Sequence, residues 1–130
     1  MKRLITVSLI ITSFGTLLGA CEQSGQSDGE AIQETTSEFI NAFLNDQFSR
    51  CLDFMADSRR DIEGDISLID WLYARRMIRD IAIILYIGEP TIAGTTATLW
   101  LDVKSALGIV STIQISLVKE GDEWRIYNFK

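Results

Sequence analysis

The sequence predicts an α+β fold in which N-terminal helices pack on a four-stranded antiparallel sheet. Apolar residues recur with helical spacing between residues 31 and 55 and again between 66 and 81. After residue 95, apolar and polar residues alternate with a period of two, as they do in strands that bury one face. Helices followed by a run of antiparallel strands are typical of the α+β class.

The N-terminal segment predicts a secretory signal peptide over residues 1–20. The chain opens with MKR, which carries two positive charges, and the next charged residue is Glu22. The apolar run over residues 4–18 is shorter than the roughly 20 residues that a transmembrane helix needs. A buried helix is the alternative interpretation, but this run has no polar face, so we expect a cleaved signal.

The sequence LGAC follows this apolar run at residues 18–21. It resembles the lipobox of bacterial lipoproteins, in which an aliphatic residue and two small residues precede an obligatory cysteine. The resemblance implies that Cys21 carries lipid and that the signal is cleaved before it. We therefore expect membrane lipid as a partner and a lipid-anchored location in a bacterial cell envelope. Because Glu22 is not an aspartate, the resemblance implies the periplasmic face of the outer membrane or the cell surface in a Gram-negative cell.

Residues 22–30, EQSGQSDGE, contain no apolar side chain and predict a flexible tether. We expect a signal peptide over 1–20, a lipidated cysteine and tether over 21–30, and one domain over 31–130. After cleavage, ten basic residues stand against eighteen acidic ones, a net charge of −8. This balance argues against a nucleic-acid partner, because such binding neutralises phosphates with Lys and Arg.

The first helical segment is interrupted by Asn45-Asp46-Gln47, which favours two helices that meet at this turn. Cys51 lies on the apolar stripe, so we interpret it as a small core residue rather than a reactive thiol. If Cys21 is acylated, Cys51 has no disulfide partner within the chain. The polar segment SRRDIEGD at 58–65 predicts a loop or a ragged helix end.

Asp65 is expected to cap a third helix. The apolar residues of this helix are expected to face the core; they are Ile66, Ile69, Trp71, Leu72, Met77, Ile78 and Ile81. We interpret its arginines as a solvated face that pairs with nearby acids, and an anion or headgroup site is the alternative. The arginines are Arg75, Arg76 and Arg79, and the acids are Asp61, Glu63 and Asp80.

The segment IAIILYI at 81–87 predicts the first strand. Pro90 predicts a sheet edge or a bulge at residues 88–90, because proline cannot donate a ladder hydrogen bond. The second strand is expected to place Ala97, Leu99, Leu101 and Val103 on one face and Thr96, Thr98, Trp100, Asp102 and Lys104 on the other. A third strand alternates through Ile109, Ile113, Ile115 and Leu117, and the last contains Trp124 and Ile126.

The helical stretch FINAFLNDQFSRCLDFMA and the closing EGDEWRIYNF resemble segments of the nuclear transport factor 2-like superfamily, over residues 31–130. Small bacterial lipoproteins of that superfamily look most similar. The resemblance implies a strongly curved sheet wrapped around the helices to form a cone with a pocket. A bent first strand at Gly88-Glu89-Pro90 agrees with this curvature. Members serve as enzymes, ligand-binding modules and assembly subunits, so the fold leaves the function open.

An enzyme of this superfamily is implied to use Asp, Tyr or His side chains, as isomerases and dehydratases do, but the chain has no histidine. The remaining candidates, Asp70, Asp102, Tyr73 and Tyr86, are better interpreted as ordinary surface groups. One free thiol and scattered carboxylates predict no metal site, and the sequence has no glycine-rich phosphate loop. We therefore expect no catalytic residue, no cofactor and no enzymatic activity.

A ligand-binding module is an alternative function, with Trp71, Tyr73, Tyr86 and Trp100 as candidate pocket-lining residues. Aromatic residues at helix and strand spacing are more often ordinary core. The lipobox, the tether and Trp100 on a partly exposed strand face favour a membrane-anchored interaction or scaffold module. We expect this function, with an envelope protein as partner.

Overall fold

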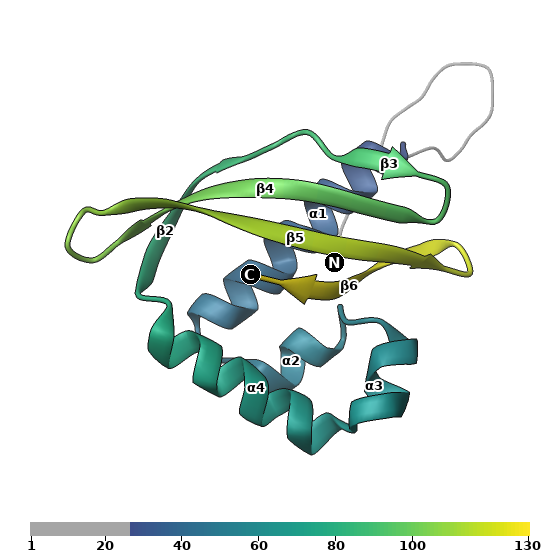
Figure 1. Ribbon diagram of the computed structural model, residues 1–130, viewed down its shortest axis with the longest axis horizontal. Helices are drawn as coiled ribbons and strands as arrows, with labels where there is room; N and C mark the ends of the chain where they lie inside the picture. Colours follow the sequence, from purple (N-terminus) through teal and green to yellow (C-terminus); the bar gives the residue numbers. More distant parts are fainter. Residues whose placement is uncertain (1–26) are drawn as a thin grey trace, which may run out of the picture.

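The computed structural model describes residues 27–130, in which a layer of helices lies against an antiparallel sheet (Figure 1). The expected signal peptide over 1–20, Cys21 and most of the expected tether lie outside the described residues. The helices are α1 Asp28–Leu44, α2 Phe48–Leu52, α3 Asp57–Glu63 and α4 Asp65–Ile78. The strands are β2 Ile81–Ile87, β3 Thr91–Ala93, β4 Thr96–Ser105, β5 Val110–Glu120 and β6 Glu123–Phe129. This order confirms the expected α+β class. Among residues 27–130, no helix has the length and apolar character needed to cross a membrane.

Helix α1 begins inside the segment that we expected to be a tether. Ser27 Oγ accepts a 3.2 Å hydrogen bond from the amide of Glu30, and the Glu30 carboxylate accepts one of 3.2 Å from the amide of Ser27. This reciprocal capping box starts a helix in a stretch that has no apolar residue. The expected tether is therefore wrong for residues 28–30, which form the first turn of α1.

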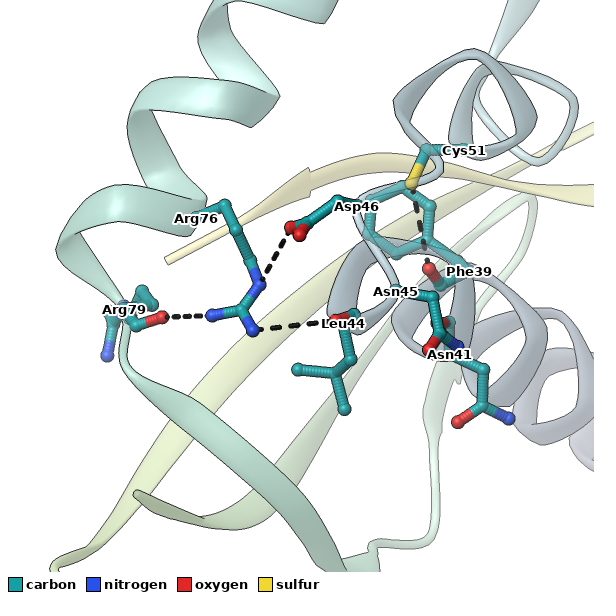
Figure 2. Close-up of polar contacts among 8 residues, drawn as sticks. All are labelled: Phe39, Asn41, Leu44, Asn45, Asp46, Cys51, Arg76 and Arg79. Atoms are coloured by element: carbon teal, nitrogen blue, oxygen red, sulfur yellow. Dashed lines mark hydrogen bonds and ion pairs between the residues drawn. The ribbon is translucent and has the colours of Figure 1, made fainter. Parts of the chain in front are cut away.

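The expected turn at Asn45-Asp46-Gln47 is confirmed, because it joins α1 to α2. Asp46 has a positive φ of 59°, a conformation that Asp tolerates better than most residues. Cys51 of α2 is fully buried, as expected of a small core residue. Figure 2 shows its sulfur facing the carbonyl oxygen of Phe39 on α1, at 3.8 Å.

A loop or a ragged helix end was expected over 58–65, and this is wrong, because these residues form most of α3 and the start of α4. Gly64, with a φ of 83°, separates the two helices and is the N-cap of α4. Asp65 was expected to be that cap but instead accepts two 2.9 Å hydrogen bonds from Arg60. The pair stabilises the turn between α3 and α4.

Helix α4 buries only part of the apolar set that we expected to face the core: Leu72 is buried, and Ile69 and Trp71 are partly buried against the core. Leu68 and Leu72 are buried, whereas Ile66, Met77 and Ile78 are exposed. The expected set of apolar residues points in too many directions around the helix to face one core. Tertiary contacts decide which side of α4 packs on α1 and α2. The apolar residues on the opposite side of α4 are exposed to solvent.

The sheet has the order β2-β4-β5-β6, and β3 pairs with β4 on the same side as β2. The described chain contains five strands where four were expected, because a bend at residues 88–90 divides the first strand. Gly88 donates a 2.8 Å hydrogen bond to the carbonyl of Trp100 at this bend. A Cβ at Gly88 would lie 2.9 Å from that oxygen, so the close approach requires glycine. The expected bent strand is confirmed.

The predicted alternation is confirmed for β4 and for Ile113, Ile115 and Leu117 of β5, which provide the sheet side of the core. The expected start of this alternation at Ile109 is wrong, because Ile109 precedes β5 and is largely exposed. Leu99, Ile115 and Phe129 are buried and lie opposite one another in neighbouring strands. Phe129 makes edge-to-face contacts with Phe39 and Phe43 of α1, at centroid distances of 5.7 and 5.1 Å. The helices therefore cover the face of the sheet that carries these residues (Figure 1).

The segment between α2 and α3 runs beside β6. Met55 forms a parallel bridge with Ile126. The amide of Ala56 donates a 2.8 Å hydrogen bond to the carbonyl of Ile126, whose own amide donates one of 2.7 Å to Phe54. These contacts cover an edge of β6 whose amides and carbonyls would otherwise be open to pairing.

Candidate functional site

The four aromatic residues expected to line one pocket lie in different parts of the molecule. Trp71 on α4 is half-buried, and its ring makes an edge contact with Phe129 at a centroid distance of 5.1 Å. Tyr73, also on α4, is exposed. Tyr86 and Trp100 are 58% and 54% exposed on the outer face of the sheet, opposite the helices. Tyr86 and Trp100 are same-face neighbours on paired strands, but the sheet separates them from Trp71 and Tyr73, so the four residues do not line a common pocket.

A groove lies where the end of α4 faces the β4–β5 hairpin. Its volume is about 230 Å³. Its walls are mainly aliphatic and are formed by Ile78, Ile81, Val103, Leu107 and Ile109. Arg79, Asp80, Ser105 and Ser111 contribute polar groups. Apolar side chains from the helix layer and from the sheet therefore meet here on an open surface.

The tip of the β4–β5 hairpin holds aliphatic side chains in solvent. Ser105 Oγ accepts hydrogen bonds of 3.2 Å from the amide of Leu107 and 3.1 Å from the amide of Ile109. Gly108, with a φ of 87°, supplies the left-handed conformation that closes the turn. Leu107 is 85% exposed, and Ile109 is also largely exposed. The turn therefore holds two aliphatic side chains in solvent beside the groove.

Arg76 ties the end of α4, and with it one wall of the groove, to the end of α1 (Figure 2). Its Nη1 donates a 3.1 Å hydrogen bond to the carbonyl of Arg79, and its Nη2 donates one of 3.4 Å to the carbonyl of Leu44. Its Nε lies 3.3 Å from Asp46 Oδ1, an ion pair without the alignment of a hydrogen bond. A cation beside the last carbonyls of α1 also interacts favourably with the helix dipole. Arg76 was expected to pair with Asp61, Glu63 or Asp80, and this is wrong, because its ion pair is with Asp46 and it links two helices.

Two other hollows are larger and more polar. One, of about 810 Å³, lies at the α3–α4 turn, where Arg60 and Asp65 pair. Their hydrogen bonds raise the pKa of Arg60 and lower the pKa of Asp65, so this charged pair is already satisfied. The other, of about 430 Å³, lies between α1 and the β5–β6 turn. Within residues 27–130, no group of three or more His, Cys, Asp or Glu side chains could hold a metal ion. The aliphatic groove is therefore the strongest candidate site.

Sequence reasoning missed this groove. Leu107 lies in a turn at residues 105–108, where polar residues are usual and an aliphatic one is not. The uncharged sequence SALGIV at 105–110 was the signal that could have found it. The local sequence could not show that Ile78 forms a wall of the groove, because the exposure of Ile78 depends on which face of α4 is buried.

Comparisons with known proteins support the fold. No family model matches the sequence, and no curated protein matches it. Among solved structures, the chain is similar to a protein from Campylobacter jejuni provisionally named an NTF2-like transpeptidase, with a TM-score of 0.51 and 14% identity. This similarity covers 73% of this chain and 96% of that chain. A SEC-C motif containing protein from Rhodopseudomonas palustris has a TM-score of 0.43 and 12% identity over 70% of each chain, and is too distant to carry an argument. The first similarity supports the nuclear transport factor 2-like fold that the sequence suggests.

Proposed function

We propose that this protein is a bacterial cell-envelope lipoprotein, anchored through acylated Cys21, whose domain is a non-catalytic docking module for an envelope protein. The anchor rests on the apolar signal and on LGAC at residues 18–21, which lie outside the described structure. The docking role rests on one observation, the aliphatic groove between the end of α4 and the β4–β5 hairpin.

The size and composition of the groove favour the side chains of a protein partner. Its volume of about 230 Å³ is below the roughly 300–1,000 Å³ of pockets that enclose small molecules. Leu107 and Ile109 extend the aliphatic surface onto the exposed hairpin tip, and Arg79 and Asp80 supply charged groups beside it. An apolar centre with polar surroundings is the usual composition of a protein–protein contact.

A small apolar ligand in the same groove is the second candidate function. The aliphatic walls would accept it, and the groove is open to solvent at the hairpin. The aromatic residues that we expected to line a pocket would not contact such a ligand, because they do not surround one common site. This function therefore has weaker support than docking of a protein.

An enzymatic role, including an isomerase, a dehydratase or the transpeptidase named for the structural neighbour, has less support. Covalent group transfer needs an activated nucleophile. Cys51 is fully buried, and burial raises the pKa of its thiol to about 12. Asp102 accepts a 3.0 Å hydrogen bond from Thr112 on the outer face of the sheet, and Asp70 lies on the exposed face of α4. We therefore assign no catalytic residue.

Photo-crosslinking in intact membranes tests the docking role. A photo-reactive amino acid in place of Leu107 should give a discrete adduct with an envelope protein. The same amino acid in place of Ile62 is the matched control, because Ile62 is similarly exposed but lies on α3. An Ile109→Ser substitution should remove the adduct at position 107 and leave the melting temperature unchanged, since this side chain is largely exposed.

The same variants separate the two candidate functions. Equal adducts at positions 107 and 62, or an adduct that survives Ile109→Ser, would contradict the docking role. Native mass spectrometry of the purified protein reports on the second function. A bound small molecule present in the parent and absent from the Ile109→Ser variant would favour the ligand-binding module.

A further inference from the structure

The outward face of α4 carries a row of exposed residues that the described chain leaves uncovered. Ile66, Tyr73 and Met77 are 80%, 57% and 70% exposed, and Asp70 lies among them on the same side. We call these four residues the α4 seam. The opposite side of the helix buries Leu68 and Leu72. A helix with apolar residues on two opposite sides usually has a neighbour on each of them.

The spacing of the α4 seam is that of a coiled-coil interface. Its positions are 66, 70, 73 and 77, so that steps of four, three and four follow one another. These steps match alternate d and a positions of two heptads, which keep one line of side chains facing a partner helix. The 14 residues of α4 span about 21 Å, long enough for such a contact.

The α4 seam is also complementary to itself. Its spacing reads the same in both directions, so a two-fold axis between residues 71 and 72 places Ile66 opposite Met77 and Asp70 opposite Tyr73 of a second copy. The first pair is apolar. In the second, a tyrosine hydroxyl can donate a hydrogen bond to a carboxylate. Within residues 27–130, neither the Asp70 carboxylate nor the Tyr73 hydroxyl has a hydrogen-bond partner.

We propose that α4 pairs in antiparallel orientation with α4 of a second copy of this chain, through the α4 seam. Such an interface is isologous, because the same surface is used on both copies. A membrane surface fits the seam less well, since a carboxylate at its centre is costly to bury in lipid and no Lys or Arg lies on it. The α4 seam does not include Leu107 or Ile109, so the two proposals rest on different residues.

Disulfide trapping of the purified full-length protein tests the orientation. An Ile66→Cys/Met77→Cys double variant should form a covalent dimer on oxidation, because the two introduced thiols face each other across the axis. Each single variant should give no more dimer than the parent, which carries Cys21 and Cys51. In the proposed arrangement two copies of position 66 lie about 16 Å apart along the helix, beyond the reach of a disulfide. A double variant without dimer, or a dimer from a single variant, would overturn the proposal.

A residue swap tests the central pair by sedimentation. Tyr73→Asp places two carboxylates opposite each other, so the association constant should fall by at least about tenfold. The Asp70→Tyr/Tyr73→Asp double variant restores a tyrosine opposite an aspartate and should recover dimerisation. Leu107→Asp, in the groove, should leave dimerisation unchanged.

The Tyr73 ring also makes an edge contact with Phe48 at a centroid distance of 6.1 Å, so Tyr73→Asp could weaken association by destabilising the fold. A second variant distinguishes these two effects. Tyr73→Phe keeps this ring contact, removes the hydroxyl donor and should still weaken association. A monomeric parent, a swap that fails to recover dimerisation, or a Leu107→Asp variant that alone abolishes it would each overturn the α4 interface. The crosslinking at position 107 would be unaffected by that failure.

Discussion

Glu120, at the end of β5, caps helix α3 at Asp57, a residue 63 positions earlier in the chain. Its Oε1 accepts a 2.7 Å hydrogen bond from the amide of Asp57, and its Oε2 accepts one of 3.2 Å from the amide of Ser58. Ala56, the N-cap residue of α3, makes no side-chain capping bond. Burial raises the pKa of Glu120, but the amide hydrogen bonds outweigh it and hold this pKa below its ordinary value. A carboxylate on the sheet therefore satisfies the free amides of a seven-residue helix.

Glu120→Ala is expected to destabilise the fold by about 0.5–2 kcal/mol, the range for a lost helix cap. Urea unfolding followed by circular dichroism measures this change. Asp122→Ala, on the adjoining turn, is the matched control, because Asp122 is exposed and its side chain caps no helix within residues 27–130. An equal effect of the two substitutions would show that the cap contributes nothing.

Asp28 is expected to make stability depend on acidity. Its Oδ1 accepts a 3.0 Å hydrogen bond from Trp124 Nε1 and one of 3.3 Å from Lys119 Nζ. The bond from Trp124, and then that from Lys119, lower the pKa of Asp28 below its ordinary value of 3.8. The folded state thus favours the ionised carboxylate. The stabilisation that Asp28 contributes is fully present above pH 3.8, the ordinary pKa of the group. It is lost as the pH falls through the lower pKa that Asp28 has in the folded state.

Asp28→Asn should therefore lower stability at pH 7, and the difference from the parent should shrink in strong acid. Urea midpoints of the two proteins at pH 7 and at about pH 2 measure this convergence. A difference that stays constant over this range would show that the carboxylate charge is not the cause.

Cys51 is expected to resist thiol reagents in the folded protein. Burial raises the pKa of its thiol to about 12, so almost no thiolate is present near neutral pH. In a Cys21→Ser chain, where Cys51 is the remaining cysteine, labelling should be slow until denaturant is added. Cys51→Ala should keep the fold at a cost of about 1 kcal/mol. Rapid labelling of the native protein, or a dimer that reductant abolishes, would mean that this face of α2 is open.

Thr36→Val is expected to leave stability unchanged or to raise it by about 1 kcal/mol. Thr36 on α1 is fully buried, and its hydroxyl has no hydrogen-bond partner within residues 27–130. A buried hydroxyl without a partner is destabilising, and valine replaces it with a methyl group of similar size. Thermal unfolding measures the effect against Thr35→Val at the neighbouring, less buried position. A clear loss of stability at position 36 alone would reveal a partner for its hydroxyl.

Cys21→Ser is expected to abolish lipid modification. Metabolic labelling with a fatty acid should mark the parent and the Cys51→Ala control but leave the Cys21→Ser variant unmarked. The physical reason is that the proposed lipid is attached through the thiol of this residue. Label retained by Cys21→Ser would remove the basis for the proposed anchor.

The sheet could be predicted from the sequence because its signal is local. Buried Leu99 and Leu101 alternate with outward-facing residues along one strand, and the same pattern recurs in β5. The buried face of helix α4 could not be predicted in the same way, because the helix has apolar residues on two sides. Whether Leu68 or Ile66 is buried depends on the elements that pack against the helix rather than on its own sequence.

Contacts between distant segments account for the other differences. Helix α3 was missed because its cap, Glu120, lies 63 positions later in the sequence than the amide of Asp57 that it binds. The partner of Arg76 was missed because Asp46 lies in the turn after α1 rather than one helical turn away. The candidate groove likewise needs Ile78 of α4 and Leu107 of the hairpin to meet in three dimensions.

The bridge between Met55 and Ile126 has a consequence for the order of folding. It joins the segment after α2 to a strand that lies much later in the sequence, and Phe129 fills the core beneath α1 only once β6 has been made. Long loops must close before these contacts stabilise anything, which slows folding. The helical part of a nascent chain therefore lacks its permanent neighbours until β6 has emerged.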